Sequence, residues 1–333
     1  VEAFGRHLAV HPEKAALVSE GRTVSYAELD AWSSSLANGL LGAPPTAQPV
    51  VALASWLGPE AIAWLLATLK AGLVAAPLDH REPDASLLAT AERLGARLVL
   101  PDGARAAGLV AAGPRSAVSA LHELDMGDTT APQVRVDPAR PAFLASSSGT
   151  TGTPKTSVLT QSVVEVLGER TLAGHAGSRI GIVLPPAFLA AYAPITECWF
   201  TGATGYCLDL TRAPLTDRGP WMEACRLTAI ALTPSIARMV AEPLAAAGRS
   251  LPFVERVTLG GEPVTRSDVR TLAQVFTEAD FVNVYGSVDA TLVSYHVIDD
   301  PAALPPGPVS AGRPVGTVEI VDGQGGVGRG HER

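Results

Sequence analysis

A segment rich in glycine and hydroxyl groups, Ser146 to Lys155 (SSSGTTGTPK), directly follows the apolar run 143–145. Glycines let a backbone turn closely around an anion, serine and threonine hydroxyls donate hydrogen bonds to phosphate oxygens, and lysine adds a compact positive charge. After a strand, these residue types predict a loop that binds polyphosphate. Pro154 stands where the Walker pattern has its second glycine, which indicates a phosphate loop of another type. A surface linker is the alternative interpretation.

The composition favours a small molecule as the partner. The 333 residues carry 25 Lys and Arg against 33 Asp and Glu, a formal net charge of −8, without a basic run. This balance argues against nucleic acid or an anionic membrane surface. Three cysteines are too few for a disulfide framework, which predicts a reducing, cytoplasmic location. The most apolar stretch, 61–78, is interrupted by Lys70, Gly72 and Pro77 and predicts a buried helix and a strand rather than a membrane span.

Short apolar runs alternate with helical patterns, which is the rhythm of βαβ units. Runs this apolar on successive positions predict strands that are covered on both faces. The expected strands are 50–54, 73–78, 97–100, 143–145, 180–184, 205–208, 229–232, 257–259 and 281–285, and the expected helices are 60–69, 85–94, 234–247 and 266–276. Segments 44–49 and 111–138 are expected to be connections, the second with a short strand near Val118.

The fold class that follows is α/β, with two parallel-rich β-sheet subdomains flanked by helices. Isolated strand signals at 316–321, without helices between them, indicate the start of a different, all-β unit. The chain starts without a methionine and ends in a glycine-rich tail, so it is expected to be a piece of something longer.

Further motifs accompany the phosphate loop in a fixed order. Residues 24–29 (VSYAEL) and 69–79 (LKAGLVAAPLD) precede it, and 260–262 (GGE), 283–286 (NVYG) and 312–314 (GRP) follow it. With the loop, these motifs resemble the adenylate-forming, AMP-binding superfamily, most closely the large N-terminal lobe of the adenylation domains of nonribosomal peptide synthetases. The resemblance extends from residue 1 to about residue 322.

The resemblance implies an organisation in three parts. Residues 46–171 would form the first α/β subdomain with the phosphate loop, residues 1–45 and 172–303 the second α/β subdomain, and residues 304–333 a partial β-barrel subdomain with the glycine-rich tail. The mobile C-terminal lobe of the family is absent from the sequence. We therefore expect either a large N-terminal lobe by itself or an adenylation domain interrupted by an inserted domain, with feeble adenylation and no thiolation by this chain alone.

In the family that these motifs resemble, a carboxylate attacks the α-phosphorus of ATP, pyrophosphate leaves, and the acyl-adenylate passes to a phosphopantetheine thiol on a carrier protein. The resemblance implies an ATP-dependent ligase that activates an acid, with ATP and Mg²⁺ as cofactors. It also implies a small-molecule carboxylic acid, a carrier protein and neighbouring synthetase domains as partners.

The resemblance assigns roles to individual residues. Thr150, Thr151, Lys155 and Asp289 would be catalytic, and Asp289 would bind Mg²⁺. The residues expected to bind the nucleotide are Ser147, Ser148, Gly149, Thr150, Thr151, Gly152, Lys155, Gly260, Gly261, Glu262, Asn283, Tyr285, Gly286 and Ser287. Tyr285 is expected to stack on adenine and Asn283 to lie near its edge. Val288 and Asp289 replace a threonine and a glutamate of the family, which removes one hydroxyl contact and shortens the carboxylate ligand.

The acid pocket of the family aligns without a gap on Phe188 and the residues after it. Leu189 replaces the aspartate that pairs with the α-ammonium of an amino acid, and an unpaired ammonium in an apolar pocket is costly. The other aligned positions are all apolar: Ala190, Ala193, Ala231, Val257, Leu259, Val284, Leu292 and Val293. The expected substrate is a hydrophobic acid without an α-amino group, namely an α-keto or α-hydroxy acid, an aryl acid or a fatty acid.

Two other functions remain as alternatives. An acyl-CoA or fatty-acyl-AMP ligase would share the phosphate loop and differ in the acceptor of the acyl group. A degenerate adenylation-like scaffold would bind partners without catalysis, which is compatible with Val288 and with the missing lobe.

Overall fold

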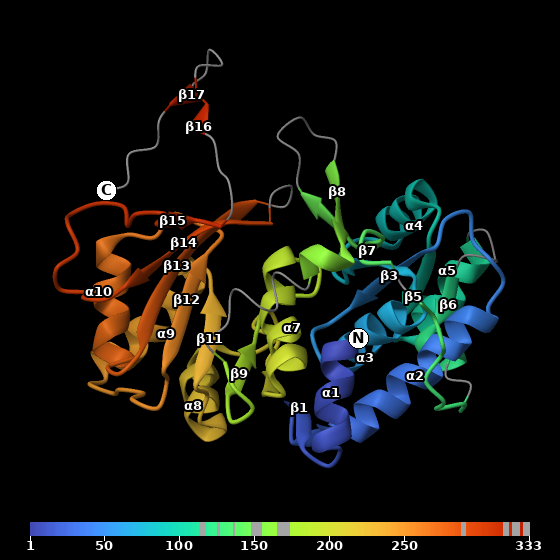
Figure 1. Cartoon of the computed structure of the whole chain (residues 1–333), viewed down its shortest axis with the longest axis horizontal. Helices are drawn as coiled ribbons and strands as arrows, with labels where there is room; N and C mark the ends of the chain where they lie inside the picture. The colour runs from blue at the N-terminus through green and yellow to red at the C-terminus, as the bar shows by residue number, and fades with distance from the viewer. Residues whose placement is uncertain are drawn as a thin grey trace. The chain divides into compact units, whose positions relative to one another are not determined.

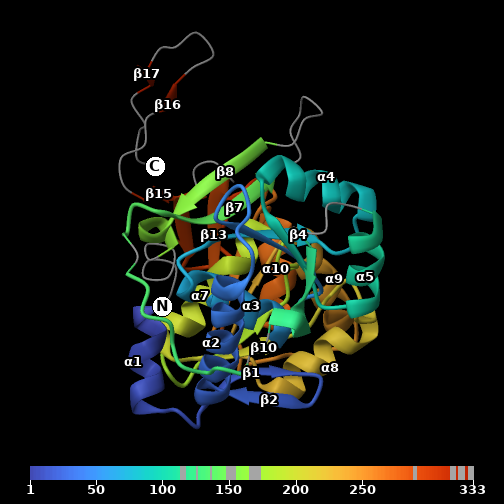
Figure 2. The same ribbon diagram turned by 90° about the vertical axis from the view of Figure 1, so that its right-hand side faces the viewer.

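The computed structural model describes residues 1–112, 118–124, 127–135, 137–147, 155–164, 174–287, 291–315, 320–321 and 327–328. Contacts within the chain divide it into two compact units, Val1–Ile230 and Ala231–Arg333, here unit 1 and unit 2. The elements of both units are labelled in Figures 1 and 2.

Unit 1 contains a six-stranded sheet with the strand order β6-β5-β3-β4-β7-β8. The strands are β3 (Val50–Ser55), β4 (Val74–Asp79), β5 (Arg97–Leu100), β6 (Val118–Ala120), β7 (Pro141–Ser147) and β8 (Lys155–Thr160). They are parallel except for β8, which runs antiparallel to β7. Every residue of β3 and β5 is buried, as expected for a sheet covered on both faces.

Helices cover the two faces of this sheet. They are α3 (Pro59–Lys70), α4 (Asp84–Leu94) and α5 (Gly103–Ala112). Leu87 of α4 and Leu109 of α5 share a core with Ala52 of β3. The α3 helix is buried along almost its whole length because α2 (Tyr26–Gly42) packs beside it (Figure 2).

A buried ion pair joins α2 and α3. The Nζ atom of Lys70 lies 2.6 Å from Oδ1 of Asp30 and also donates to the Ser34 hydroxyl at 2.8 Å. Only 4% of the Lys70 side chain is exposed. Burial lowers the pKa of the Lys70 ammonium, and Asp30 offsets part of this effect. The LKAG motif therefore fixes α2 against α3.

The rest of unit 1 forms a second ladder of strands. The strands are β1 (Ala15–Ser19), β2 (Arg22–Ser25), β9 (Arg179–Ile182), β10 (Thr204–Cys207) and β11 (Ala229–Leu232), of which β11 begins in unit 1 and has its last two residues in unit 2. The β1, β10, β9 and β11 strands are neighbours in this order and run parallel, and β2 is antiparallel to β1. The accompanying helices are α1 (Glu2–Val10), α7 (Tyr192–Thr201), α8 (Leu215–Cys225) and the short 3-10 helix η2 (Leu189–Ala191).

In unit 2, the strands β12 (Arg256–Gly260), β13 (Asp280–Ser287), β14 (Thr291–Ile298) and β15 (Arg313–Pro314) are neighbours in this order. The β12 and β13 strands are parallel, and β13, β14 and β15 are antiparallel. The helices α9 (Pro234–Ala246) and α10 (Arg266–Val275) pack together, and α9 contacts β12 (Figure 1). Beyond residue 315, the described residues form the antiparallel pair β16 (Ile320–Val321) and β17 (Val327–Gly328).

The predicted α/β class is confirmed, since both units contain helix-flanked sheets with parallel strands. Each strand and helix predicted from residues 50 to 285 is present within two residues of its expected bounds. No bounds were predicted for several further elements, namely the helices α1, α2, α5, α7 and α8 and the strands β1, β2, β8, β14 and β15. The α5 helix is short and contains two glycines. Contacts divide the chain after Ile230, and the predicted subdomain boundaries stay a prediction. The described residues include no helix long and apolar enough to cross a membrane.

We expect Lys70→Met to reduce the free energy of unfolding by about 2–3 kcal/mol, because it leaves the Asp30 carboxylate without its buried partner. Adding Asp30→Asn should recover part of this loss. Urea unfolding measures both effects. Arg22→Gln is the matched control, since the Arg22 and Glu60 side chains are 59% and 44% exposed and 3.6 Å apart, and it should cost at most about 1 kcal/mol. If Lys70→Met and Arg22→Gln reduced the free energy of unfolding equally, Lys70 and Asp30 would not form a stabilising buried pair.

Candidate functional site

The predicted phosphate loop connects two antiparallel strands. Ser147 at the end of β7 pairs in register with Lys155 at the start of β8. A strand on each side distinguishes this loop from a Walker loop, which leads into a helix. The predicted residues Ser148, Gly149, Thr150, Thr151 and Gly152 lie outside the described residues, as does Asp289. Their roles stay predictions.

Two consecutive glycines lie where β12 ends. Gly260 is in register with Val284 of the parallel strand β13, and a Cβ atom on Gly260 would lie 2.9 Å from the Val284 carbonyl oxygen. Gly261 has a φ of +80°, which other residues rarely adopt. Both glycines are therefore required by the fold, because a Cβ atom on Gly260 would also lie 2.5 Å from the Cγ2 atom of Val284.

Asn283 and Tyr285 lie near the end of β13, on the face of the sheet that Leu259 shares and opposite to that of Val284. The Tyr285 side chain is 58% exposed, which leaves a large aromatic surface open. Asn283 is buried, and its Nδ2 atom donates a hydrogen bond to the carbonyl oxygen of Ser310 at 2.9 Å. A register shift occurs between Tyr285 and Gly286. A Cβ atom on Gly286 would collide with the carbonyl oxygen of Thr291. Ser287 continues β13 as an exposed residue.

The carboxylate of Glu262 is held by the N-terminus of α9. Its Oε2 atom accepts from the Ser235 hydroxyl at 2.5 Å and from the Ser235 backbone N–H at 3.1 Å. A negative charge at a helix N-terminus is favourable, since the N–H groups of the first turn point toward it. Glu262 thereby ties the glycine turn to α9.

A second carboxylate extends this network. Asp268 of α10 is buried and accepts from the Arg238 guanidinium at 2.5 Å and from the Thr265 hydroxyl at 2.7 Å. Burial alone would raise the pKa of the Asp268 carboxyl, but the hydrogen bonds from Thr265 and Arg238 outweigh it and hold this pKa below its usual value. Arg238 also donates to the Ser235 hydroxyl at 3.2 Å.

The predicted acid-pocket residues differ in their exposure. Leu189 and Ala190 lie on η2 and Ala193 on α7, all at least partly exposed, and Ala231, Val284, Leu292 and Val293 are partly exposed in unit 2. Val257 and Leu259 have 0% exposure. Because side chains alternate along a strand, these two lie on the opposite face of β12 from Gly260, and the structure does not bring them together with Val284. Thr258 does share that face, and counting back two residues from the glycine could have found it.

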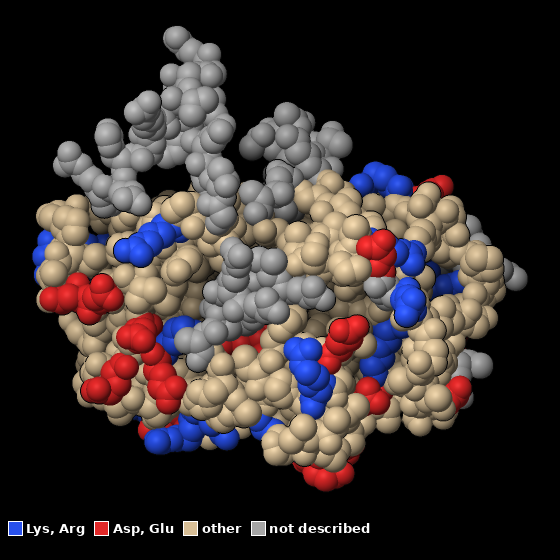
Figure 3. Space-filling view, viewed as in Figure 1, with Lys and Arg blue, Asp and Glu red and all other residues tan. Residues whose placement is uncertain are grey.

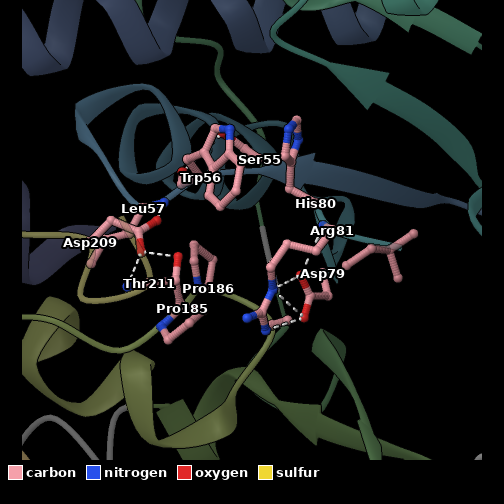
Figure 4. A pocket seen from close by; sticks show the side chains of 12 residues that line it. Ser55, Trp56, Leu57, Asp79, His80, Arg81, Pro185, Pro186, Asp209 and Thr211 are labelled. Atoms are coloured by element: carbon pink, nitrogen blue, oxygen red, sulfur yellow. Dashed lines mark hydrogen bonds and ion pairs between the residues drawn. The ribbon is translucent and has the colours of Figure 1, made fainter. Parts of the chain in front are cut away.

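A cavity that the sequence analysis did not predict lies at the carboxyl ends of β3, β4 and β5 in unit 1. Its volume is about 400 Å³, and Trp56, Glu60, His80, Asp102 and Arg212 are among its lining residues. Figure 4 shows the adjoining pocket, where the Trp56 and His80 rings lie 4.6 Å apart. Hydrogen bonds from Arg81 lower the pKa of Asp79 there, and these two side chains hold one another at the rim.

Charges of both signs are interspersed on the face that Figure 3 shows. Within the described residues, no three His, Cys, Asp or Glu side chains are grouped so that they could hold a metal ion. The one predicted Mg²⁺ ligand, Asp289, is outside this part of the chain.

We expect Asp268→Asn to lower the free energy of unfolding by about 1–3 kcal/mol at neutral pH. Because the folded-state pKa of Asp268 lies below its unfolded value, its contribution is present above the unfolded value and is lost as the pH falls through the folded one. The difference from the unsubstituted protein should therefore narrow below about pH 4 in urea titrations. Asp280→Asn, at an exposed position, serves as the control. A difference that stays constant into acid would refute this account.

Two structures of known proteins have a similar fold. The N-terminal subdomain of Klebsiella oxytoca NpsA in complex with 3-hydroxybenzoyl-AMSN superposes with a TM-score of 0.82 at 21% identity, covering 99% of this chain and 84% of that one. NpsA-ThdA, an artificially fused adenylation-PCP di-domain from the same organism, gives a TM-score of 0.81 at 21% identity, covering 98% and 66%.

Curated relatives with similar sequences include nonribosomal peptide synthetases. Nonribosomal peptide synthetase 4 of Gibberella zeae is 28% identical over 328 residues, which cover 96% of this chain and 4% of the relative. Nonribosomal peptide synthetase 6 of Cochliobolus miyabeanus is 26% identical over 319 residues, which cover 91% and 17%. The chain thus spans a small part of the length of these relatives.

One protein family accounts for nearly the whole sequence. Its description is "AMP-binding enzyme", and it matches residues 4–332. The match includes the loop between β7 and β8, the glycine turn after β12 and the tyrosine on β13. The chain therefore belongs to the AMP-binding enzyme family, as its ordered motifs predicted.

Proposed function

We propose that this chain binds the adenosine part of ATP and of an acyl-adenylate at the carboxyl ends of β12 and β13, within a domain that activates a carboxylic acid for transfer to a carrier-protein thiol. The observation that carries this proposal is the glycine turn, where a Cβ atom on Gly260 would collide with β13, together with the 58% exposed Tyr285 near the end of β13. Such a surface suits a flat aromatic base.

The residues at this edge fit an adenine. The exposed Tyr285 residue offers an aromatic face for stacking, and Gly260 and Gly261 place no side chain of their own at the end of β12. Asn283 donates through Nδ2 to Ser310, which fixes the orientation of its amide. The carbonyl oxygen of that amide is then the group that would accept a hydrogen bond from the adenine amino group.

The phosphates are assigned by the family motif. Ser148, Gly149, Thr150, Thr151, Gly152 and Lys155 would hold the β- and γ-phosphates, Ser147 would also bind the nucleotide, and Asp289 would bind Mg²⁺. When bound, Mg²⁺ neutralises charge on the phosphates. The contribution of the chain itself is to position the two reactants and to supply hydrogen-bond donors and the Lys155 charge, because phosphoryl chemistry of this kind depends on positioning and electrostatic stabilisation.

The acid is proposed to lack an α-amino group. Leu189 offers no charge to an ammonium, and the partly exposed positions assigned to the pocket, among them Ala190, Ala193 and Val284, are apolar. The NpsA complex with 3-hydroxybenzoyl-AMSN supports an aryl acid as one candidate, since that acyl group carries no α-amino group. An α-keto or α-hydroxy acid and a fatty acid remain the other candidates.

The acceptor is proposed to be a carrier protein in a synthetase assembly. The relatives named nonribosomal peptide synthetases support this choice, as does the adenylation-PCP fusion among the similar structures. Acceptance of the acyl group by coenzyme A instead would identify an acyl-CoA ligase.

Calorimetric titration with non-hydrolysable acyl-adenylate analogues tests the function. The set carries an α-amino, an α-hydroxy, an α-keto or no α-substituent on one acyl chain. We expect the analogues without the amine to bind at least about tenfold more tightly, because the ammonium would be desolvated without a partner. Tighter binding of the α-amino analogue would overturn the substrate class, and binding of none would favour a non-catalytic scaffold.

Leu189→Asp should shift the preference toward the α-amino analogue, since it places a carboxylate where the ammonium is expected. The readout is the ratio of the two dissociation constants, and we expect it to change by about tenfold or more. Leu215→Asp is the matched control, because Leu215 is 52% exposed on α8, and it should leave the ratio unchanged. An unchanged ratio in Leu189→Asp would remove Leu189 from the pocket.

A further inference from the structure

The glycine turn of unit 2 is anchored by a chain of hydrogen bonds that begins at Glu262 of the GGE motif and continues through three residues outside the sequence motifs. The chain runs from Glu262 to Ser235, from Ser235 to Arg238, and from Arg238 to Asp268. Its ends differ in environment, since Glu262 is exposed and the Asp268 side chain is 4% exposed. The network therefore connects a carboxylate at the surface, Glu262, to a carboxylate in the core, Asp268.

Arg238 is the bridge in this network. One guanidinium nitrogen, Nη1, donates to Asp268, and the other, Nη2, donates to the Ser235 hydroxyl. The planar fork of an arginine suits two acceptors at fixed positions, which a lysine ammonium on a flexible stem cannot reproduce in the same way. Arg238 thus orients the Ser235 hydroxyl so that its proton points to Glu262.

We propose that Ser235 and Arg238 are positioning residues for the nucleotide. They hold the Glu262 carboxylate in place, and Glu262 in turn holds the backbone of Gly260 and Gly261. This inference rests on the proposed function, because it requires the turn to bind adenosine. Neither residue touches the nucleotide in this account. Both act through Glu262, whose carboxylate fixes the turn against the first turn of α9.

The effect on the fold should be smaller than the effect on binding. The Arg238 side chain is 41% exposed, and Asp268 keeps its hydrogen bonds from Thr265 when the arginine is removed. The capping box at the start of α10 therefore survives. Within this network, the glycine turn is connected to α9 through Glu262 alone, so no other hydrogen bond of the network replaces this connection.

Binding of AMP to the full chain, measured by calorimetry, tests the inference with a probe that does not depend on the identity of the acid. We expect Arg238→Met and Ser235→Ala each to weaken AMP binding by about tenfold. Arg238→Lys should restore part of the affinity. Met239→Ala, next to Arg238 on α9 and 41% exposed, is the matched control and should bind as the unsubstituted chain does.

A double-mutant cycle separates positioning from a general loss of structure. If Arg238 acts through Glu262, the double variant Arg238→Met, Glu262→Ala should bind AMP no more weakly than the weaker single variant. Faster hydrogen exchange at the amides of Gly261 and Glu262 in Ser235→Ala should accompany the loss. This second measurement holds even where Arg238→Met fails to fold.

The outcomes distinguish the inference from the proposed function. If the unsubstituted chain does not bind AMP, the proposed function fails. The positioning role is wrong if the unsubstituted chain binds AMP and Arg238→Met and Ser235→Ala bind it as tightly as the unsubstituted chain does. It is also wrong if the losses in Arg238→Met and Glu262→Ala multiply to about a hundredfold in the double variant.

Discussion

The parallel pairing of β12 with β13 is the constraint on which the candidate site depends. Its register sets Gly260 directly beside Val284, where no side chain fits, and it delivers the ends of both strands to the same edge. The carboxyl edge of parallel strands is where ligands bind in open α/β sheets. A side chain at residue 260 would have to push β13 away, so the register and the glycine depend on one another.

The buried carboxylate near this edge, Asp268, has hydrogen-bond partners on both of its oxygen atoms. Asp268 would be costly in the core by itself, but Thr265 and Arg238 satisfy both of its oxygens. Lys70 in unit 1 follows the same rule, with Asp30 and Ser34 as its partners. In each case a hydrogen-bonded ion pair fixes the position of one helix along the other, which apolar packing alone does not specify. The residues at the neighbouring strand ends are positioned by these helices.

The candidate site also shows how one position along a strand changes a chemical assignment. Val257 and Leu259 belong to the apolar core, whereas Thr258 and Gly260, each one residue away, share the open face with Val284. A gapless alignment of motifs does not see this alternation, because it counts residues and not faces. Among the positions of unit 2 predicted for the acid pocket, Val284, Leu292 and Val293 are partly exposed, whereas Val257 and Leu259 are not.

The sequence by itself determined the alternation of strands and helices, the family, and the positions of the glycine turn and the tyrosine. These follow from local periodicity and from residue types, such as glycine, that a particular backbone conformation requires. Tertiary structure alone decided that Glu262 is bound to Ser235, that Asn283 is committed to Ser310, and that Val257 and Leu259 are core residues. Each of these depends on which segments meet in space, and residues separated by 27 positions, as Ser235 and Glu262 are, leave no local pattern in the sequence. The short helix α5 was missed for a related reason, since its burial against β5 and β6 outweighs the low helix propensity of its glycines.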